Sequence, residues 1–170
     1  MIEILKIVLP ALLVLITAYL LIDKLLRNEE KRRNFELKQK NASVITPIRL
    51  RAYERLMLVL ERTSPNVVVL NTVKNGMTNL ELQTQLISTI RQEFSHNVSQ
   101  QIYVSNELWT TIKSTQESLI QLINSCAART TPTANATSLA ELIIQVYAAT
   151  EKTPTEIAAE ILKKEVAGLM

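Results

Sequence analysis

The sequence predicts a mainly α-helical protein, in which an N-terminal transmembrane helix continues into a cytoplasmic helical domain with at most two short strands. Three observations support this prediction. Residues 7–22 form an uncharged, almost wholly apolar run near the N-terminus. Beyond that run, apolar residues recur at three- and four-residue spacing, which is typical of helices that bury one face. The chain also has only two glycines and five prolines to interrupt helices.

The segment Ile4–Ile22 is predicted to cross a membrane as one helix, because about 20 apolar residues span a bilayer core about 30 Å thick. Lys6 can extend its ammonium to the headgroups, and membrane helices tolerate a proline such as Pro10. A cleavable signal peptide fits less well, since Glu3 offsets Lys6 and no small-residue cleavage site follows the run. A buried core helix would need a larger domain.

The flanking charges predict the orientation of this segment. Lys6 is the only basic residue before it, whereas residues 23–40 hold seven Lys and Arg against four Asp and Glu. The positive-inside rule therefore predicts an N-terminus outside and a cytoplasmic domain. The chain is therefore expected to cross the membrane once, with the lipid bilayer as one partner; the bacterial inner (cytoplasmic) membrane as its location is implied by the family resemblance given below. A basic juxtamembrane helix or linker is expected over 24–45, with a helix end near Asn41.

The composition of the remaining chain argues against several classes of function. Residues 41–170 hold eleven basic and eleven acidic residues, so no basic surface for nucleic acid is expected. One histidine and one cysteine cannot form a zinc site alone, and two glycines cannot form a phosphate-binding loop. We therefore expect no metal, no cofactor and no enzymatic activity.

A helical domain is predicted over 46–128. Its first helix is expected to begin with Thr46 as N-cap and Pro47 at the first helical position. Thr78 and Glu81 form a capping-box pattern at the start of the second helix, and Ser105 or Asn106 caps the third. The three predicted helices cover residues 47–63, 78–97 and 106–128. The expected core residues are Leu86, Ile90, Trp109, Ile112 and Leu119, with Cys126 as a small buried hydrophobe.

Two short β-branched runs, 67–70 and 102–104, are predicted as strands that can pair with each other. The Thr-rich segment 129–137 is predicted as a linker. A helical hairpin is expected over 138–170, with helix starts at Ser138 and at Thr153-Pro154. Its apolar stripes must dock on the domain, on another copy or on a partner, because a two-helix hairpin cannot bury both alone.

Three segments of the sequence carry a resemblance to a known family, and the resemblance covers about half of the chain. They are residues 53–65, 91–97 and 100–105, with Arg91–Asn97 and Gln100–Ser105 the most distinctive. In these segments the chain resembles an uncharacterised family of small single-span membrane proteins of Gram-negative bacteria. The resemblance implies an inner-membrane location and no known activity.

Glu93 and His96 lie three residues apart, as in half of a carboxylate-bridged di-iron site, but no second Glu-x-x-His occurs. A histidine near a helix C-terminus also interacts favourably with the helix dipole. The surrounding polar segment either forms a recognition surface or satisfies nearby backbone groups. The candidate recognition residues are Glu93, His96, Asn97, Gln100, Gln101 and Tyr103.

From these observations we expect a membrane-anchored, non-enzymatic interaction or structural protein that presents a helical domain at the cytoplasmic face. Its partner is expected to be another protein or a second copy of itself. The alternative is a small-ligand-binding or enzymatic domain that uses the polar segment Glu93–Ser105.

Overall fold

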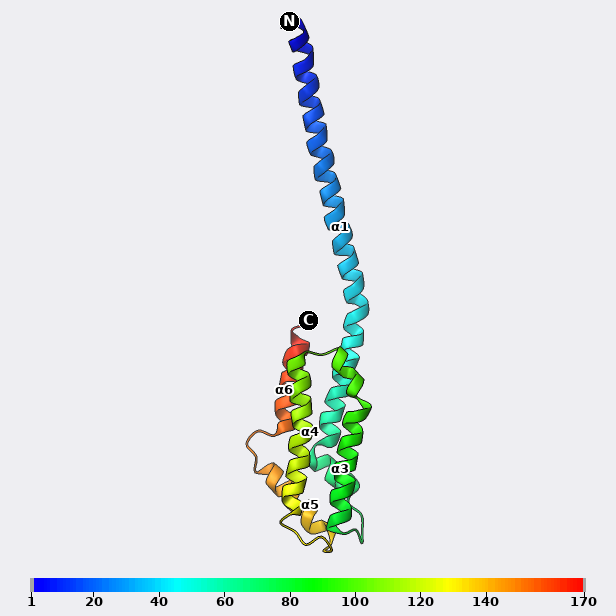
Figure 1. Cartoon of the computed structure of the whole chain (residues 1–170), viewed down its shortest axis with the longest axis vertical. Helices are drawn as coiled ribbons and strands as arrows, with labels where there is room; N and C mark the ends of the chain where they lie inside the picture. Colours follow the sequence, from blue (N-terminus) through cyan, green and yellow to red (C-terminus); the bar gives the residue numbers. More distant parts are fainter. Residues whose placement is uncertain (1, 170) are drawn as a thin grey trace. The chain divides into compact units, whose positions relative to one another are not determined.

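The computed structural model describes residues 2–169, with side chains described at positions 12, 15–17 and 19–169. These residues divide into two compact units, 1–45 and 46–170, which are described separately. No β-strand occurs in the described range; Thr78 and Asn135 form an isolated bridge. The helices are α1 (Ile2–Thr63), α2 (Pro65–Thr72), α3 (Asn79–His96), the 3-10 helix η1 (Val98–Ile102), α4 (Asn106–Ala127), α5 (Ala136–Ala148) and α6 (Pro154–Ala167) (Figure 1).

The predicted transmembrane helix over 1–23 is contradicted. Within the described part of the chain, no helix is long and apolar enough to cross a membrane. The described apolar side chains of the first unit give way to charges at Asp23, Lys24 and Arg27. The side chains at 1–11, 13, 14 and 18 lie outside the described residues. The predicted single-pass topology and inner-membrane location are corrected on the same finding.

The first unit is helical up to Ile45, and nearly all of its described side chains are exposed. Arg27 Nε lies 2.9 Å from Asp23 Oδ2, and Arg32 Nε lies 3.0 Å from Glu36 Oε1. Such exposed pairs four residues apart add only weakly to the stability of a helix. The stretch after Asp23 is thus a solvated helix rich in helix-forming residues.

The predicted helix end near Asn41 and the new helix start at Thr46-Pro47 are wrong, because α1 continues through both positions. Proline removes one backbone donor, and residues 41–46 before it are mostly weak helix formers, so the unbroken helix is favoured only by the good helix formers that follow over 49–52. The boundary between the two compact units nevertheless falls between Ile45 and Thr46.

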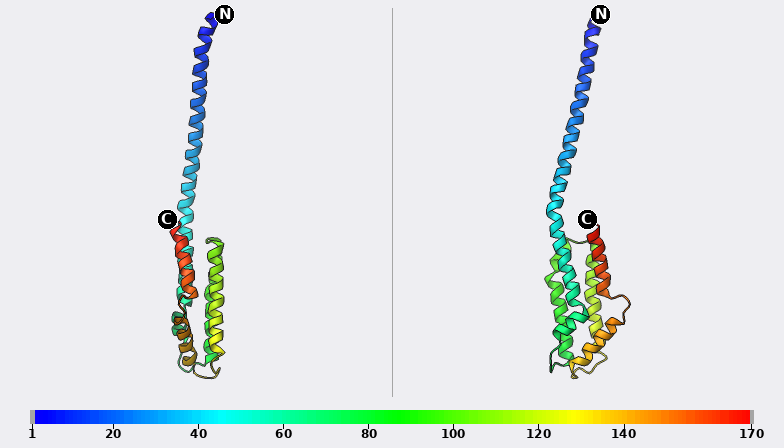
Figure 2. Two further views of the ribbon diagram at one scale, coloured as in Figure 1. Left: turned by 90° about the vertical axis from the view of Figure 1, so that its left-hand side faces the viewer. Right: turned by 180° about the vertical axis from the view of Figure 1, so that it is seen from behind.

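The second unit is a two-layered helical bundle. In the side view of Figure 2, α3 and α4 lie in one layer, and the segment of α1 after Thr46 lies with α6 in the other. α4 packs against α3, α5 and α6, and α2 packs against α3 and α5. The predicted helices 47–63, 78–97 and 106–128 correspond to the end of α1, to α3 and to α4.

One core runs through this bundle. Leu86, Ile90, Ile112 and Leu119 are buried as predicted, whereas Trp109 is only half-buried at the edge. Cys126 is a free, buried thiol, and burial raises its pKa, as expected for a small hydrophobe rather than a nucleophile. The largest fully buried side chains are Tyr53, Leu56, Leu60, Leu82, Leu86, Ile90, Leu108, Ile112, Leu119, Ile123, Leu139 and Ile143.

Both predicted strands are wrong. Residues 67–70 lie in α2, and residues 102–104 lie at the end of η1 and in the turn after it. Pro65 occupies the first position of α2, where a helix does not need its N–H. Val68 and Val69 are buried in the core from this helix, so packing outweighs the preference of valine for strands.

The helix starts follow their capping residues. The predicted capping box at Thr78 is confirmed, since Thr78 N donates to Glu81 Oε2 at 2.8 Å and Glu81 N donates to Thr78 Oγ1 at 3.3 Å. The second box, at the predicted start Thr153-Pro154, has the same geometry. Glu81 accepts hydrogen bonds from the Thr78 backbone and side chain, which lower its pKa. The start predicted at Ser138 is wrong, because Asn135 caps α5 and the helix begins at Ala136.

α5 and α6 bury their apolar stripes within the second unit. Leu139 and Ile143 of α5, and Ala158 and Leu162 of α6, all belong to the common core. The segment before α5 is tied to the start of α3 by buried Asn79, whose Nδ2 donates to the carbonyl of Thr131 at 2.8 Å and whose N–H donates to that of Ala134 at 2.9 Å. The two C-terminal helices therefore have no unused apolar stripe of their own.

Candidate functional site

Three of the predicted recognition residues lie together at the end of α3. Glu93 and His96 belong to its last turn, and Asn97 is its C-cap residue. They line a depression of about 350 Å³ together with residues of α1. The α1 residues are Arg55, Leu58, Val59 and Arg62. The sequence analysis had not included these α1 residues in the candidate surface.

The other predicted residues do not join this depression. Gln100 and Gln101 lie on η1, and Tyr103 lies just after it. The side chain of Asn97 hydrogen-bonds to the backbone, since its Nδ2 donates to the carbonyl oxygen of Glu93 at 2.9 Å. This bond satisfies one of the carbonyl acceptors at the C-terminal end of α3. Among the described residues no group of three or more His, Cys, Asp or Glu side chains is placed to hold a metal ion.

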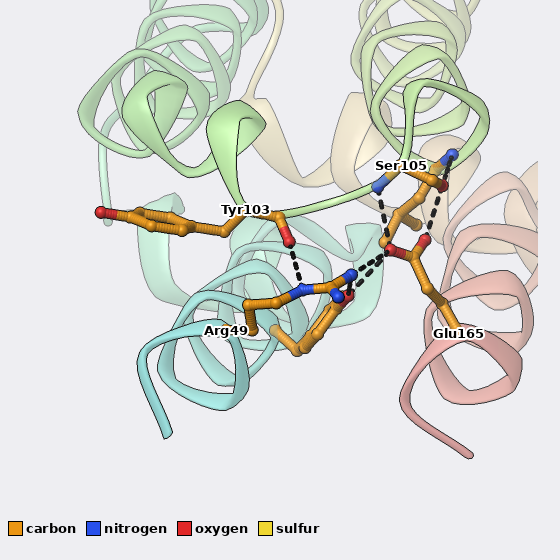
Figure 3. A network of polar contacts seen from close by, with 6 residues as sticks. Arg49, Tyr103, Ser105 and Glu165 are labelled. Atoms are coloured by element: carbon orange, nitrogen blue, oxygen red, sulfur yellow. Dashed lines mark hydrogen bonds and ion pairs between the residues drawn. The ribbon is translucent and has the colours of Figure 1, made fainter. Parts of the chain in front are cut away.

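The backbone of Tyr103 belongs to a second polar site, centred on Glu165 of α6 (Figure 3). Arg49 Nε donates to the carbonyl of Tyr103 at 3.0 Å, and an Nη of Arg49 donates to Tyr53 Oη at 2.8 Å. Tyr53 Oη in turn donates to Glu165 Oε1 at 2.8 Å. The backbone N–H and Oγ of Ser105 donate to Glu165 Oε1 and Oε2 at 2.8 and 2.6 Å. We call these five residues the Glu165 network.

The Glu165 network is electrostatically complementary. Burial alone would raise the pKa of Glu165, but hydrogen bonds from Ser105 and Tyr53 and the charge of Arg49 outweigh it, so the pKa lies below its usual value. Burial and the hydrogen bond to Glu165 raise the pKa of Tyr53. Since Ser105 also caps α4, with Leu108 N donating to its Oγ at 3.1 Å, the network fastens α1, α4 and α6 together. The Glu165 network therefore stabilises the contacts between these three helices.

The network was missed in the sequence, apart from Ser105 as a helix cap. Arg49, Tyr53 and Glu165 stand far apart in the chain, and each by itself has the spacing of an ordinary helix residue. Arg49 lies four residues before Tyr53, which is the one local signal that the two side chains can meet. Nothing local indicates that Glu165 joins them.

A third feature is the outward side of α1 in the second unit, which carries two rows of charges. Arg51, Arg55, Leu58 and Arg62 are spaced by four, three and four residues, which places them on one stripe of the helix. Glu54 and Glu61, seven residues apart, form a row beside it. All six side chains are exposed, and Leu58 has 51% of its surface accessible. We call these six residues the α1 outer face.

The two rows face different neighbours. Arg55 and Arg62 border the depression toward α3, where Arg62 Nη1 lies 3.9 Å from Glu93 Oε2. Glu61 borders a groove of about 770 Å³ toward α6. The other residues lining that groove are Glu151, Lys152, Glu156, Ala159, Glu160 and Lys163. The α1 outer face is thus basic along the α3 side and acidic along the α6 side, with Leu58 between the rows.

Comparison with known proteins gives one relationship. No curated protein and no solved structure matches the chain. A family of unknown function, DUF7935, matches residues 1–169, well beyond the half of the chain on which the predicted resemblance rested. The match therefore confirms the prediction that the chain belongs to an uncharacterised family. It does not test a Gram-negative origin. The chain belongs to the family of unknown function DUF7935.

Proposed function

We propose that the chain is a non-enzymatic interaction protein, whose second unit binds a protein partner or a second copy through the α1 outer face and the depression beside it. One observation carries the proposal. Leu58 is half-exposed between rows of charged side chains, and within the described residues only Arg62 among those charges has an opposite charge within 4.0 Å. An apolar centre with a charged rim is the usual anatomy of a protein–protein contact.

The surroundings of Leu58 support this choice of surface. A single exposed leucine needs no explanation by itself. Here, however, Leu58 lies on the border of a depression, and its flanking charges are sorted by sign rather than mixed. Glu93, His96 and Asn97, predicted as recognition residues, form the α3 edge of the same surface. The proposed surface therefore includes half of the predicted set and adds the α1 residues.

The apolar stripes of α5 and α6 do not support the proposal, although the sequence had suggested them as docking sites. Leu139, Ile143 and Leu162 are buried within the unit. The outer side of α6 that borders the groove beside Glu61 is mostly charged. The α1 outer face is for this reason the better supported contact surface.

Photo-crosslinking in cells tests the proposal on the full-length chain. A photoreactive amino acid at position 58 is expected to give a discrete protein–protein adduct. The same amino acid at position 70, an exposed leucine position on α2, serves as the matched control and should give none. The adduct should disappear when Arg55→Glu and Arg62→Glu are combined, and it should persist with His96→Ala.

Two results would overturn the proposal. The first is the absence of any adduct at position 58, or an adduct that the charge reversals leave unchanged. The second is loss of the cellular phenotype with His96→Ala alone, in a chain whose circular dichroism shows an intact fold. That second result would favour a ligand-binding or enzymatic site around His96 instead.

A further inference from the structure

We infer that the partner of the α1 outer face is the same face of a second copy of this chain, with the two α1 segments parallel. The inference rests on the proposed function and names its partner. It is drawn from the order of charges on the face, which is complementary to itself in one arrangement of the two copies and repulsive in the other.

The face repeats every seven residues. Arg51 is followed by Leu58, Glu54 by Glu61, and Arg55 by Arg62, each after seven positions. Seven residues make close to two helical turns, which is the spacing that keeps one side of a helix turned toward a parallel neighbour. Glu54 with Arg55, and Glu61 with Arg62, therefore form two successive contact layers with the same order of charges, whereas Leu58 takes the position of Arg51 in the second layer.

Symmetry selects the parallel arrangement. A two-fold axis that runs along α1 turns the α3 side of one copy toward the α6 side of the other. It places Arg55 opposite Glu54 of the second copy, and Arg62 opposite Glu61 of the second copy. Because the contact is isologous, each of these pairs occurs twice. An axis perpendicular to α1 would make the helices antiparallel and would set arginine rows against each other.

Leu58 lies at the centre of this contact. In the parallel arrangement the two Leu58 side chains meet across the axis, between the two layers of ion pairs. Each exposed ion pair changes an association constant by at most about fivefold, so the pairs mainly set the orientation. Like charges placed opposite each other have a larger effect, and reversing one row should weaken association at least about tenfold.

Arg51 makes the inference sharper. It precedes Leu58 by one repeat and so comes close to its counterpart across the same axis, where two like charges oppose association. Replacing Arg51 by leucine should therefore tighten self-association. If the face instead received an acidic segment of another protein, Arg51→Leu would remove an attractive charge and weaken binding.

Charge reversal in the full-length chain provides the main experiment, with sedimentation equilibrium as the measurement. One variant combines Arg55→Glu with Arg62→Glu, and a second combines Glu54→Arg with Glu61→Arg. The wild-type chain is expected to dimerise, and each variant alone to do so at least about tenfold more weakly. An equimolar mixture of the two variants restores all four opposite-charge pairs, so it should form heterodimers with close to wild-type affinity.

The matched control reverses charges on another exposed surface. Lys113→Glu combined with Glu117→Arg, both exposed on α4, should leave the dissociation constant unchanged. Because the heterodimer can form only if both variants are folded, its recovery also shows that the single variants have not simply unfolded. The circular dichroism of each variant provides the independent check.

Cysteine crosslinking tests the parallel orientation. A short bismaleimide should join two copies of Leu58→Cys, and also two copies of Arg51→Cys, because Arg51 lies one repeat before Leu58 and so close to the same axis. An antiparallel pair centred on Leu58 would hold the two Arg51 positions far apart, about 20 Å along the helix axis. The native Cys126 is buried and should not react.

The outcomes separate this inference from the proposed function. A monomeric wild-type chain that still forms an adduct to a different protein from position 58 overturns the inference and leaves the proposed function standing. A monomeric chain with no adduct overturns both. A dimer that is indifferent to both charge reversals, or that crosslinks through Leu58→Cys but not through Arg51→Cys, overturns the parallel pairing.

Discussion

Arg49 and Arg51 stand two residues apart on the same helix and have opposite surroundings. The Arg49 guanidinium donates to Tyr53 and to the carbonyl of Tyr103, and it lies 3.5 Å from Glu165 Oε1, with 31% of its side chain exposed. Arg51 points to the other side of α1 and is exposed. The inner side of this helix has its polar groups satisfied within the unit, whereas on the outer side only Arg62 among the described charges has an opposite charge within 4.0 Å.

The difference shows how one helix can serve two purposes. Charged groups that converge from several elements, as in the Glu165 network, fix the relative positions of those elements and leave little capacity for a ligand. Charged groups sorted by sign along an open face add little to the stability of the unit, because exposed ion pairs are weak. Substitutions on the two sides should therefore affect different quantities.

The largest difference is expected between two leucines of α1. Leu56 is 1% exposed and Leu58 is 51% exposed. Leu56→Ala should lower the free energy of unfolding by about 2–5 kcal/mol, because it removes buried methyl groups and leaves a cavity. Leu58→Ala should lower it by less than about 1 kcal/mol. Urea unfolding of the full-length chain, at a concentration low enough to keep it monomeric, measures both values.

Equal losses of stability in the two leucine variants would contradict this assignment of sides. Leu58 would then contribute to the core, and the apolar centre of the α1 outer face would not exist. A loss below about 0.5 kcal/mol for Leu56→Ala would likewise show that the inward side has been misplaced.

Local signals predicted the helices well. Thr78 with Glu81, and Thr153 with Glu156, mark helix starts because a capping box satisfies donors at fixed positions of the chain. The position of Leu86 in a helically spaced series of apolar residues identified the buried face of α3 in the same way. These features depend on residues within one or two turns of each other, so the sequence alone contains them.

The errors arose where distant contacts outweigh local preference. The valines of residues 67–70 favour a strand, yet α2 packs them as a helix against α3 and α5. Ser138 resembles a cap, but its Oγ donates to the carbonyl of Asn135 and exchanges hydrogen bonds with buried Asn79, and Asn135 caps the helix instead. The predicted membrane span depended on the uncharged apolar run over residues 7–22 and its flanks, and no helix within the described residues is long and apolar enough to cross a membrane.

The candidate site was half predictable for a similar reason. Glu93, His96 and Asn97 are adjacent in sequence, so their grouping was visible in advance. Their neighbours on α1 come from more than thirty residues earlier, and no spacing rule links Arg62 to Glu93. The sorting of charges on α1 was present in the sequence as a seven-residue repeat, but its meaning depends on knowing which side of α1 is buried.

A smaller difference in stability is expected between Glu165, in the Glu165 network, and Glu54, on the α1 outer face. Glu165→Ala removes a carboxylate that accepts three hydrogen bonds, and it leaves Tyr53 Oη and Ser105 N–H without their acceptor. The free energy of unfolding should therefore fall by about 1–3 kcal/mol. Glu54→Ala, on the α1 outer face, should change stability by less than about 0.5 kcal/mol. Thermal unfolding monitored by circular dichroism compares them.

The reverse pattern is expected for self-association. Glu54→Ala should weaken the dimer, and Glu165→Ala, once allowance is made for any unfolded fraction, should not. If Glu165→Ala cost no stability, the network would be an incidental surface arrangement. The distinction between the satisfied and unsatisfied sides of α1 would then fail.

The smallest expected effect is the contribution of Glu165 to the pH dependence of the free energy of unfolding. The pKa of Glu165 in the folded chain lies below its ordinary value of 4.5, so the ionised carboxylate is favoured by folding. Its contribution is therefore present above pH about 4.5 and is lost as the pH falls through the folded pKa. The stability difference between wild type and Glu165→Gln, which cannot titrate, should shrink over that acidic range.

Tyr53→Phe sharpens this measurement. The variant removes one hydrogen bond that lowers the pKa of Glu165 while keeping the aromatic ring in the core. The acid loss of stability should still begin near pH about 4.5, but it should be smaller than in wild type and complete at a higher pH. Urea unfolding at several pH values between about 3 and 7 follows both differences. A difference between wild type and Glu165→Gln that stays constant over this range would mean that the carboxylate is no more favoured in the folded chain than in the unfolded one. The Glu165 network would then hold the helices together without any contribution from its charge.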